Sequence, residues 1–266
     1  MKAYIQFDFE GIAGFVIRDT EDRNIPTVLE RTHRMMKIAS AEVSAAANGA
    51  FAAGADEVVI WDSHGKGNTL LIEELPEKAE LITGDYDRGP WLPFFEGTDV
   101  GIYIGGHAMT GTPRAVTPHT RIEVNGRSYG EVGMFILECG ARDVPVVLVS
   151  GDTAVEREIA DMIPKSNFVA TKDAVGPTLA KSITPALSCK RIFSAARRGV
   201  RSRAHIPPCR ITPPYTFGYT GSGAPLSYTD PGDDLLTGYR RFLKKHLGYT
   251  KGWPEYDLQN EDYGVD

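Results

Sequence analysis

Short apolar, β-branched runs alternate with longer segments of helical character along this chain, and this alternation constrains the fold more than any other feature. Residues 57–61 form one such run, and residues 144–149 form an almost continuously apolar one, which is typical of a strand covered on both faces. Strands that alternate with helices form a mostly parallel sheet with helices packed on it, so we predict a layered α/β fold. The predicted strands span residues 2–9, 57–61, 79–83, 99–104 and 144–149, and the predicted helices span residues 26–54, 131–141, 154–162, 185–198 and 233–247.

The segment around Asn125-Gly126 departs from this alternation. These two residues favour the positive φ angles of a type I′ turn, and residues 121–124 and 127–129 flank them as short strands. We therefore predict an antiparallel hairpin inserted beside the main sheet. Later in the chain, proline-rich crossings and a Gly/Ser/Tyr-rich stretch replace the alternation. The predicted domains are a main α/β domain over residues 1–190 and a smaller α+β region over residues 191–266.

The composition is that of an ordinary globular protein, and it argues against several functional classes. With a net charge of −6, the chain lacks the broad basic surface that nucleic-acid binding requires. Its 3 cysteines are isolated from one another, so neither a disulfide framework nor a thiolate zinc site is expected. No apolar run approaches the roughly 18 residues that span a bilayer, and Asp8 and Glu10 interrupt the run that a signal peptide would need. We predict a cytoplasmic protein that binds neither nucleic acid nor membrane.

Acidic and histidine side chains follow the predicted strands at the point where each strand ends. Asp8 and Glu10 follow the first strand, and because residues i and i+2 of a strand point to the same side, both carboxylates project together. In parallel α/β sheets ligands bind beyond the carboxyl ends of the strands, so side chains that follow the other strands belong to the same edge. These side chains are His64, His107 and Glu131, with His119 in the loop before the hairpin.

This set of residue types points to metal chemistry. Adjacent carboxylates repel each other unless a cation or a basic group holds them. Carboxylates with imidazoles suit zinc and related ions, whereas oxygen ligands alone would suit magnesium or calcium. Five such ligands fit two ions about 3.5–4 Å apart that share a carboxylate and a nucleophilic water, so the expected reaction is hydrolysis. Taken singly, the acids are as well explained as helix caps and the histidines as loop residues; their joint placement favours a metal site.

Taken together, the motifs at these positions resemble those of the zinc-dependent D-aminopeptidases of the DppA type, the M55 peptidase family. The resemblance covers roughly residues 1–190. The motifs are FDFEGIAG at residues 7–14, DSHGK at 62–66, GHA at 106–108, GEVG at 130–133 after the Asn125-Gly126 hairpin, and VSGD at 149–152. The resemblance implies two zinc ions per subunit. Asp8 would bridge them, Glu10 and His64 would complete one site, and His107 and Glu131 the other.

The resemblance also implies a catalytic role for His119. We prefer proton transfer or stabilisation of the tetrahedral intermediate for this residue, because a metal-bound water is already a competent nucleophile. Asp62 is expected to orient His64 or to cap its loop, and Lys66 and Asn68 are expected to contact substrate. We therefore predict a dizinc aminopeptidase that removes N-terminal residues, D-amino acids by the resemblance, from short peptides or amides. Family members form homo-oligomers as large as a decamer of stacked pentamers, in which residues 191–266 would serve assembly and the pocket wall.

Two other functions stay open on the residues alone. A magnesium-dependent phosphatase of the haloacid dehalogenase class also begins with a strand that ends in two carboxylates, and it would use Gly151-Asp152. That class has Asp and then Thr or Val where this chain has Glu10 and Ile12, and it leaves the histidines without a role. A non-catalytic, ring-forming binding protein would have kept the fold without the chemistry, although all five ligand types are present.

Overall fold

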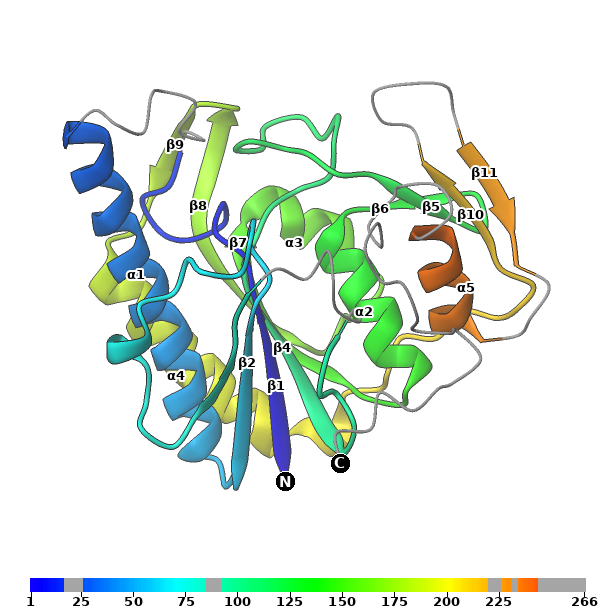
Figure 1. Ribbon diagram of the computed structural model, residues 1–266, viewed down its shortest axis with the longest axis horizontal. Helices are drawn as coiled ribbons and strands as arrows, with labels where there is room; N and C mark the ends of the chain where they lie inside the picture. The colour runs from blue at the N-terminus through cyan, green and yellow to red at the C-terminus, as the bar shows by residue number, and fades with distance from the viewer. Residues whose placement is uncertain (17–25, 85–91, 220–225, 231–233, 244–266) are drawn as a thin grey trace.

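The computed structural model describes residues 1–16, 26–84, 92–219, 226–230 and 234–243 (Figure 1). A seven-stranded sheet with the order β3-β2-β1-β4-β7-β8-β9 forms its centre. All neighbouring strands in it are parallel except β8 and β9, so the predicted mostly parallel α/β fold is confirmed. The strands are β1 (Lys2–Phe7), β2 (Glu57–Asp62), β3 (Glu80–Ile82), β4 (Thr98–Gly106), β7 (Val146–Asp152), β8 (Asn167–Gly176) and β9 (Leu179–Ser182).

The order of the strands reverses next to β1. The chain runs from β1 outward to β2 and β3, and then returns to pair β4 with the other side of β1. At such a reversal the connections leave in opposite directions, and a crevice opens beyond the carboxyl ends of the two strands. The loops that follow β1 and β4 therefore lie at the natural ligand-binding position of this fold.

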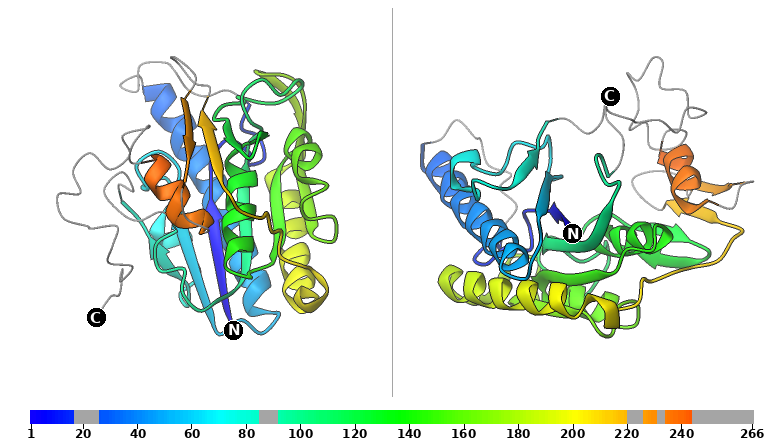
Figure 2. Two further views of the ribbon diagram at one scale, coloured as in Figure 1. Left: turned by 90° about the vertical axis from the view of Figure 1, so that its right-hand side faces the viewer. Right: turned by 90° about the horizontal axis from the view of Figure 1, so that it is seen from below.

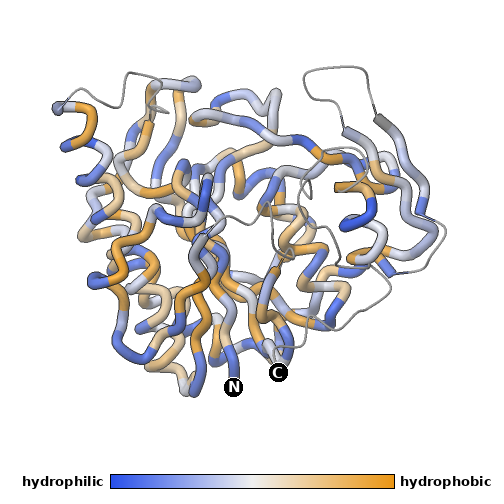
Figure 3. Tube along the Cα trace, viewed as in Figure 1, coloured by the Kyte–Doolittle hydropathy of each residue, from blue (hydrophilic) through white to orange (hydrophobic). Residues whose placement is uncertain are grey.

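Helices cover both faces of the sheet (Figure 2). Alternate side chains of β1 enter two different hydrophobic clusters: Ala3, Ile5 and Phe7 pack with residues of α1 and α4, whereas Tyr4 joins the cluster that contains residues of α2 and α3. Figure 3 shows the hydrophobic residues concentrated in the central strands. The helices are α1 (Pro26–Phe51), α2 (Glu131–Ala141), α3 (Thr153–Ile159), α4 (Pro185–Arg201) and α5 (Leu235–Phe242), with short 3-10 turns at η1 (Ile72–Glu74) and η3 (Arg203–His205).

A second, antiparallel sheet has the order β11-β10-β5-β6. The predicted hairpin is confirmed as β5 (Ile122–Val124) and β6 (Arg127–Tyr129), and Asn125 and Gly126 have φ angles of 51° and 77° in its turn. Rather than lying beside the main sheet as a ribbon, it pairs with β10 (Thr216–Tyr219), which in turn pairs with β11 (Leu226–Thr229). The sheet therefore joins residues from both sides of the predicted domain boundary.

The structure differs from the sequence-based expectations in several elements. Strands β8 to β11 were not predicted, and α5 covers only part of the helix predicted over residues 233–247, of which residues 233 and 244–247 lie outside the described residues. Residue 190 lies inside α4, and the division into two domains stays a prediction. None of the described helices is both long and apolar enough to cross a membrane.

Candidate metal centre

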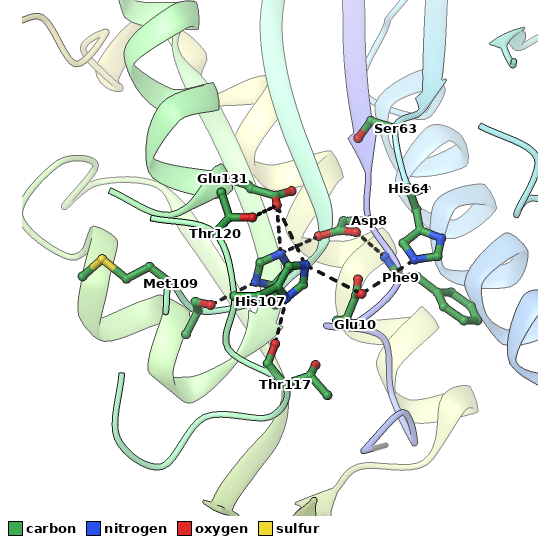
Figure 4. A network of polar contacts seen from close by, with 12 residues as sticks. Asp8, Phe9, Glu10, Ser63, His64, His107, Met109, Thr117, Thr120 and Glu131 are labelled. Atoms are coloured by element: carbon green, nitrogen blue, oxygen red, sulfur yellow. Dashed lines mark hydrogen bonds and ion pairs between the residues drawn. The ribbon is translucent and has the colours of Figure 1, made fainter. Parts of the chain in front are cut away.

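The five predicted metal ligands converge at the carboxyl ends of the central strands (Figure 4). Asp8 and Glu10 lie in the loop after β1, His64 in the loop after β2 and His107 directly after β4. Glu131 is the first residue of α2, which begins directly after the hairpin. The predicted catalytic residue, His119, lies among them. The six side chains thus lie close together, although most of them come from separate segments of the chain.

The candidate ligand atoms fall into overlapping groups of three, each with all atoms within 4.8 Å of one another. One group is Asp8, Glu10 and His64, and another is Asp8, His107 and Glu131, so that Asp8 belongs to both. A third group joins Glu10 and His107 to His119. Nε2 of His107 lies 3.3 Å from Asp8 Oδ2 and 3.4 Å from Glu131 Oε1, and Nε2 of His64 lies 3.7 Å from Glu10 Oε1.

These distances fit a shared cation. Two ligand atoms of a tetrahedral zinc ion with bonds of about 2.0–2.1 Å lie about 3.3–3.4 Å apart. Within the described part of the chain, Asp8 Oδ2 and His107 Nε2 are buried and form no hydrogen bond, although they face each other. Buried polar atoms without hydrogen bonds are rare in folded proteins, and a metal ion bound between these two atoms would satisfy both. The residues present therefore fit a metal ion.

The close approach of two loops brings Asp8 and Glu10 to His107. The amide of Gly11 donates to the carbonyl oxygen of Gly105 at 2.7 Å, and a Cβ on Gly11 would lie 2.1 Å from the carbonyl oxygen of Gly106. A Cβ on Gly105 would lie 1.9 Å from the carbonyl oxygen of Asp8, and the φ of Gly105 is +83°. Only glycine tolerates the close contact at Gly11, and only glycine tolerates both the contact and the angle at Gly105, so these glycines set the spacing of the carboxylates and the imidazole.

The histidines are oriented through their Nδ1 atoms. Nδ1 of His107 contacts the carbonyl oxygen of Ala108 at 2.9 Å, and Nδ1 of His119 contacts that of Thr117 at 2.8 Å. Because a carbonyl oxygen only accepts, both Nδ1 atoms carry a proton, and in the neutral rings the lone pair lies on Nε2. Those Nε2 atoms are the ones that face the carboxylates. Such fixed rings are typical of metal ligands and of general bases.

Two threonines support the cluster, and the sequence reasoning missed both. The hydroxyl of Thr69 contacts Nδ1 of His64 at 2.8 Å, and the hydroxyl of Thr120 donates to Glu131 Oε1 at 2.6 Å. Threonine is common in loops, and no local pattern marks these two. Their roles depend on the paths of the loops that carry them.

Asp62 has one of its two predicted roles. Its Oδ2 accepts hydrogen bonds from the amides of Thr69 and Leu70 at 2.6 Å and 2.8 Å, so Asp62 caps the loop that carries His64. The ring of His64 is held by Thr69 instead. Lys66 and Asn68 are exposed on the same loop, and contact with substrate stays a prediction for both.

The cluster concentrates negative charge. Burial raises the pKa of Asp8 well above its usual range, and the charge of Glu10 adds to this effect. Burial alone would lower the pKa of His107, but Glu131, Asp8 and Glu10 outweigh it and raise that pKa to about 10. Burial likewise opposes ionisation of Glu131, yet His107 and Thr120 lower its pKa to about 2. The site therefore strongly attracts positive charge.

The ring of His119 stacks on that of His107, with centroids 3.7 Å apart and an angle of 13° between the planes. Burial, aided by the charge of His107, lowers the pKa of His119. Nε2 of His119 lies 3.9 Å from Glu10 Oε1 and 3.9 Å from Glu131 Oε1. His119 is therefore neutral near pH 7 and presents a basic nitrogen to the cluster.

The fold and this cluster together define a class: an α/β protein with a buried imidazole–carboxylate centre at the reversal point of its parallel sheet. A family model for M55 peptidases, described as D-aminopeptidase, matches residues 1–223. The chain therefore belongs to the M55 peptidase family and is a hydrolase. A D-aminopeptidase of Bacillus subtilis (strain 168) is 29% identical over 221 residues, which cover 80% of this chain and 78% of the relative.

A solved structure shares the fold. It is described as a Zn-dependent D-aminopeptidase, DppA, from Bacillus subtilis, a self-compartmentalizing protease. The TM-score is 0.79 at 24% sequence identity, and the match covers 94% of this chain and 98% of that chain.

Proposed function

We propose that this chain is a zinc-dependent aminopeptidase that holds two metal ions per subunit and removes N-terminal D-amino acids from short peptides or amides. The observation that carries the proposal is the sharing of Asp8 between two groups of three ligand atoms, each group within 4.8 Å. The names of the relative and of the structural neighbour support the activity, and the neighbour's description supports zinc.

In this proposal Asp8 would be a ligand at both positions, Glu10 and His64 would complete one, and His107 and Glu131 would complete the other. Metal ions bound there would lower the pKa of a water molecule and polarise the scissile carbonyl group.

Residues beside the five proposed ligands transfer protons and contact the substrate. His119, neutral and fixed by the carbonyl oxygen of Thr117, takes up a proton from the attacking water at Nε2 and passes it to the leaving amine as the amide bond breaks. The ring of Phe9 packs against that of His64, with centroids 5.1 Å apart. Lys66 and Asn68 contact the substrate from the exposed loop after β2.

We also propose that the protein acts in the cytoplasm as a homo-oligomer, a decamer of stacked pentamers, in which residues 191–266 serve assembly and form part of the pocket wall. The description of the structural neighbour as self-compartmentalizing supports an assembly of this kind. Native mass spectrometry of the purified protein tests it, and a monomer under all salt conditions would contradict it.

The test of function is an assay of the zinc-loaded protein with matched D- and L-alanyl dipeptides and amides. We expect hydrolysis of the D-substrates and its loss, by at least about 100-fold, in His107→Ala, because that variant lacks a proposed ligand. His33→Ala is the matched control, because His33 is exposed on α1 and is not among the candidate metal ligands, and we expect it to retain wild-type activity. Wild-type activity in His107→Ala would refute the mechanism.

Metal analysis separates the remaining candidates. Protein purified without chelator is expected to carry close to two equivalents of zinc. Substantially less than one equivalent, together with no hydrolysis, would favour a non-catalytic binding protein. Phosphate release from a generic phosphoester with magnesium would favour a phosphatase.

A further inference from the structure

The strand β8 contains a β-bulge beside the candidate metal centre. In its pairing with β7, Gly151 lies opposite Ala170 and Asp152 lies opposite Lys172, so that Thr171 is the extra residue. Neighbouring side chains of a regular strand point to opposite faces, but a bulge re-aims them. Here Thr171 and Lys172 are both buried, and both contact the loop that follows β1. Bulges of this kind are common next to active sites.

Thr171 and Lys172 supply the donors for this loop. Nζ of Lys172 donates to the carbonyl oxygen of Glu10 at 2.6 Å and also to that of Phe15. The hydroxyl of Thr171 contacts the carbonyl oxygen of Gly11 at 2.6 Å. Buried backbone carbonyls need donors, and an ammonium group has three, so one lysine can tie two points of the loop together.

Acidic groups from several elements face Lys172. The side chain is only 2% exposed, and the acids whose charges act on it are Glu42 of α1, Asp152 at the end of β7, and Glu10 itself. Oε1 of Glu42 accepts a hydrogen bond from the amide of Ala13 at 3.0 Å. The basic group thus holds loop carbonyls while an acid facing it holds a loop amide. Burying a lysine without such partners would cost free energy of folding, so the surrounding carbonyls and acids stabilise Lys172 in this position.

This support reaches only one side of the candidate centre. The backbone of Asp8 is fixed independently, because its amide donates to the carbonyl oxygen of Ile104 at 2.8 Å. His107 and Glu131 have their own supports in Ala108 and Thr120. Glu10 is the predicted ligand whose own carbonyl is bound by Lys172.

We propose that Lys172 is a positioning residue for Glu10, and that the metal position formed by Glu10 and His64 depends on it, whereas the position formed by His107 and Glu131 does not. This inference rests on the proposed function only in requiring that the cluster binds metal. It explains why a bulge directs two consecutive buried side chains toward the loop. Lys172 touches no reacting atom in this role and acts through the backbone of Glu10.

The experiment measures zinc affinity by competition with a chromogenic chelator in two single-position backgrounds. His107→Ala leaves the position of Glu10 and His64, and His64→Ala leaves the position of His107 and Glu131. We expect Lys172→Met to weaken zinc binding about 10–100-fold in the His107→Ala background, as losses of such supporting contacts do. In the His64→Ala background we expect less than about a threefold change, because the supports of that position do not involve Lys172.

Two control variants calibrate the result. Thr120→Val keeps the shape of its residue but loses the hydroxyl that supports Glu131, so it is expected to show the opposite asymmetry. Lys190→Met removes an exposed lysine and is expected to change neither affinity. If circular dichroism shows that Lys172→Met folds poorly, Thr171→Val takes its place. This variant changes no charge and little volume but removes the hydroxyl that donates to the carbonyl oxygen of Gly11. We expect it to weaken zinc binding in the same background as Lys172→Met, by a smaller factor.

Equal loss of affinity in both backgrounds would show a general structural role and overturn the proposal, and so would no loss in either. Wild-type protein that binds no zinc would overturn the proposed function itself. Wild-type protein that binds two equivalents, with both backgrounds responding alike to Lys172→Met, would overturn only the positioning role.

Discussion

Glu42 is a fully buried acid on α1 that faces the loop after β1. Burial raises its pKa from 4.5 to about 7, although Ser188, the amide of Ala13 and the charge of Lys172 favour the ionised form. The folded protein therefore holds a proton on Glu42 in a pH range where the unfolded chain has lost it. Lys172, whose pKa is lowered by burial to about 8, is charged in both states over this range.

This proton makes stability depend on pH. The stability that it contributes is fully present below pH 4.5 and is lost as the pH rises to about 7. Glu42→Gln does not titrate, so we expect its free energy of unfolding to rise relative to wild type across this window, by at most about 3 kcal/mol. Urea denaturation of both proteins at a series of pH values, at one zinc concentration, measures the difference. Parallel curves for the two proteins would show that Glu42 does not titrate in this window.

Single residues also show how far the sequence determines the site. Ligands such as Asp8 and His107 could be found because strand ends meet at one edge of a parallel sheet, whatever the details of the loops. Thr69 and Thr120 could not be found, because a hydroxyl contacts an imidazole or a carboxylate only after the loop has taken its path. Lys172 was hidden for the same reason, since its contacts lie across the fold, at Glu10 and Phe15.

At the scale of elements, α1 packs on α4, and Glu42 of α1 lies close enough to Lys172 of β8 for their charges to interact. The helices approach closely at Gly49, where a Cβ would lie 2.5 Å from the carbonyl oxygen of Phe193 and 2.8 Å from Cβ of Ala196. Atoms this close must move apart, and the nearer one belongs to the backbone of α4. Gly49 therefore sets the distance between the two helices.

We expect Gly49→Ala to destabilise the protein, although alanine is the better helix former by about 1 kcal/mol. Overpacking a close contact costs about 1–3 kcal/mol, so the net loss should be on the order of 1 kcal/mol. Asn48→Ala, at the exposed neighbouring position, is the matched control and should be slightly stabilising. Urea denaturation compares the variants. A Gly49→Ala protein at least as stable as wild type would mean that the helices separate without cost.

The elements also differ in how well the sequence predicts them. Strands β2 and β7 could be recognised because each contains a run of apolar residues, 58–61 and 146–149, as burial on both faces requires. Strand β8 was missed because the polar run at residues 171–173 and the bulge at Thr171 break any regular pattern. Strands β10 and β11 are short, and β10 pairs with β11 on one side and with β5, from a distant part of the chain, on the other.

At the scale of the whole molecule, two structural elements contain residues from both sides of the predicted domain boundary at residue 190. Helix α4 runs through that residue, and the second sheet joins β5 and β6 to β10 and β11. Pairing between such distant segments leaves no local signal in the sequence, so a boundary predicted from composition does not take it into account. Within the described residues the second sheet therefore connects segments on both sides of residue 190, and the division into two domains stays a prediction.

The candidate metal centre itself connects the main elements, because its residues follow β1, β2 and β4 and begin α2. Three carboxylates meet there, and without a cation their mutual repulsion and lost hydration oppose folding. A metal that binds only the folded state stabilises it by about 2.7 kcal/mol at a concentration 100 times its Kd. For a chain of 266 residues, with an unfolding entropy of about 2.1 cal/mol/K per residue, that corresponds to about 5 °C in Tm. We therefore expect removal of zinc by dialysis against a chelator to lower the Tm by this amount, and readdition of zinc to restore it.

Differential scanning calorimetry measures the shift, and His107→Ala, which lacks one ligand, should show a smaller one. Identical melting curves with and without chelator would mean that the cluster binds no metal that stabilises the folded protein.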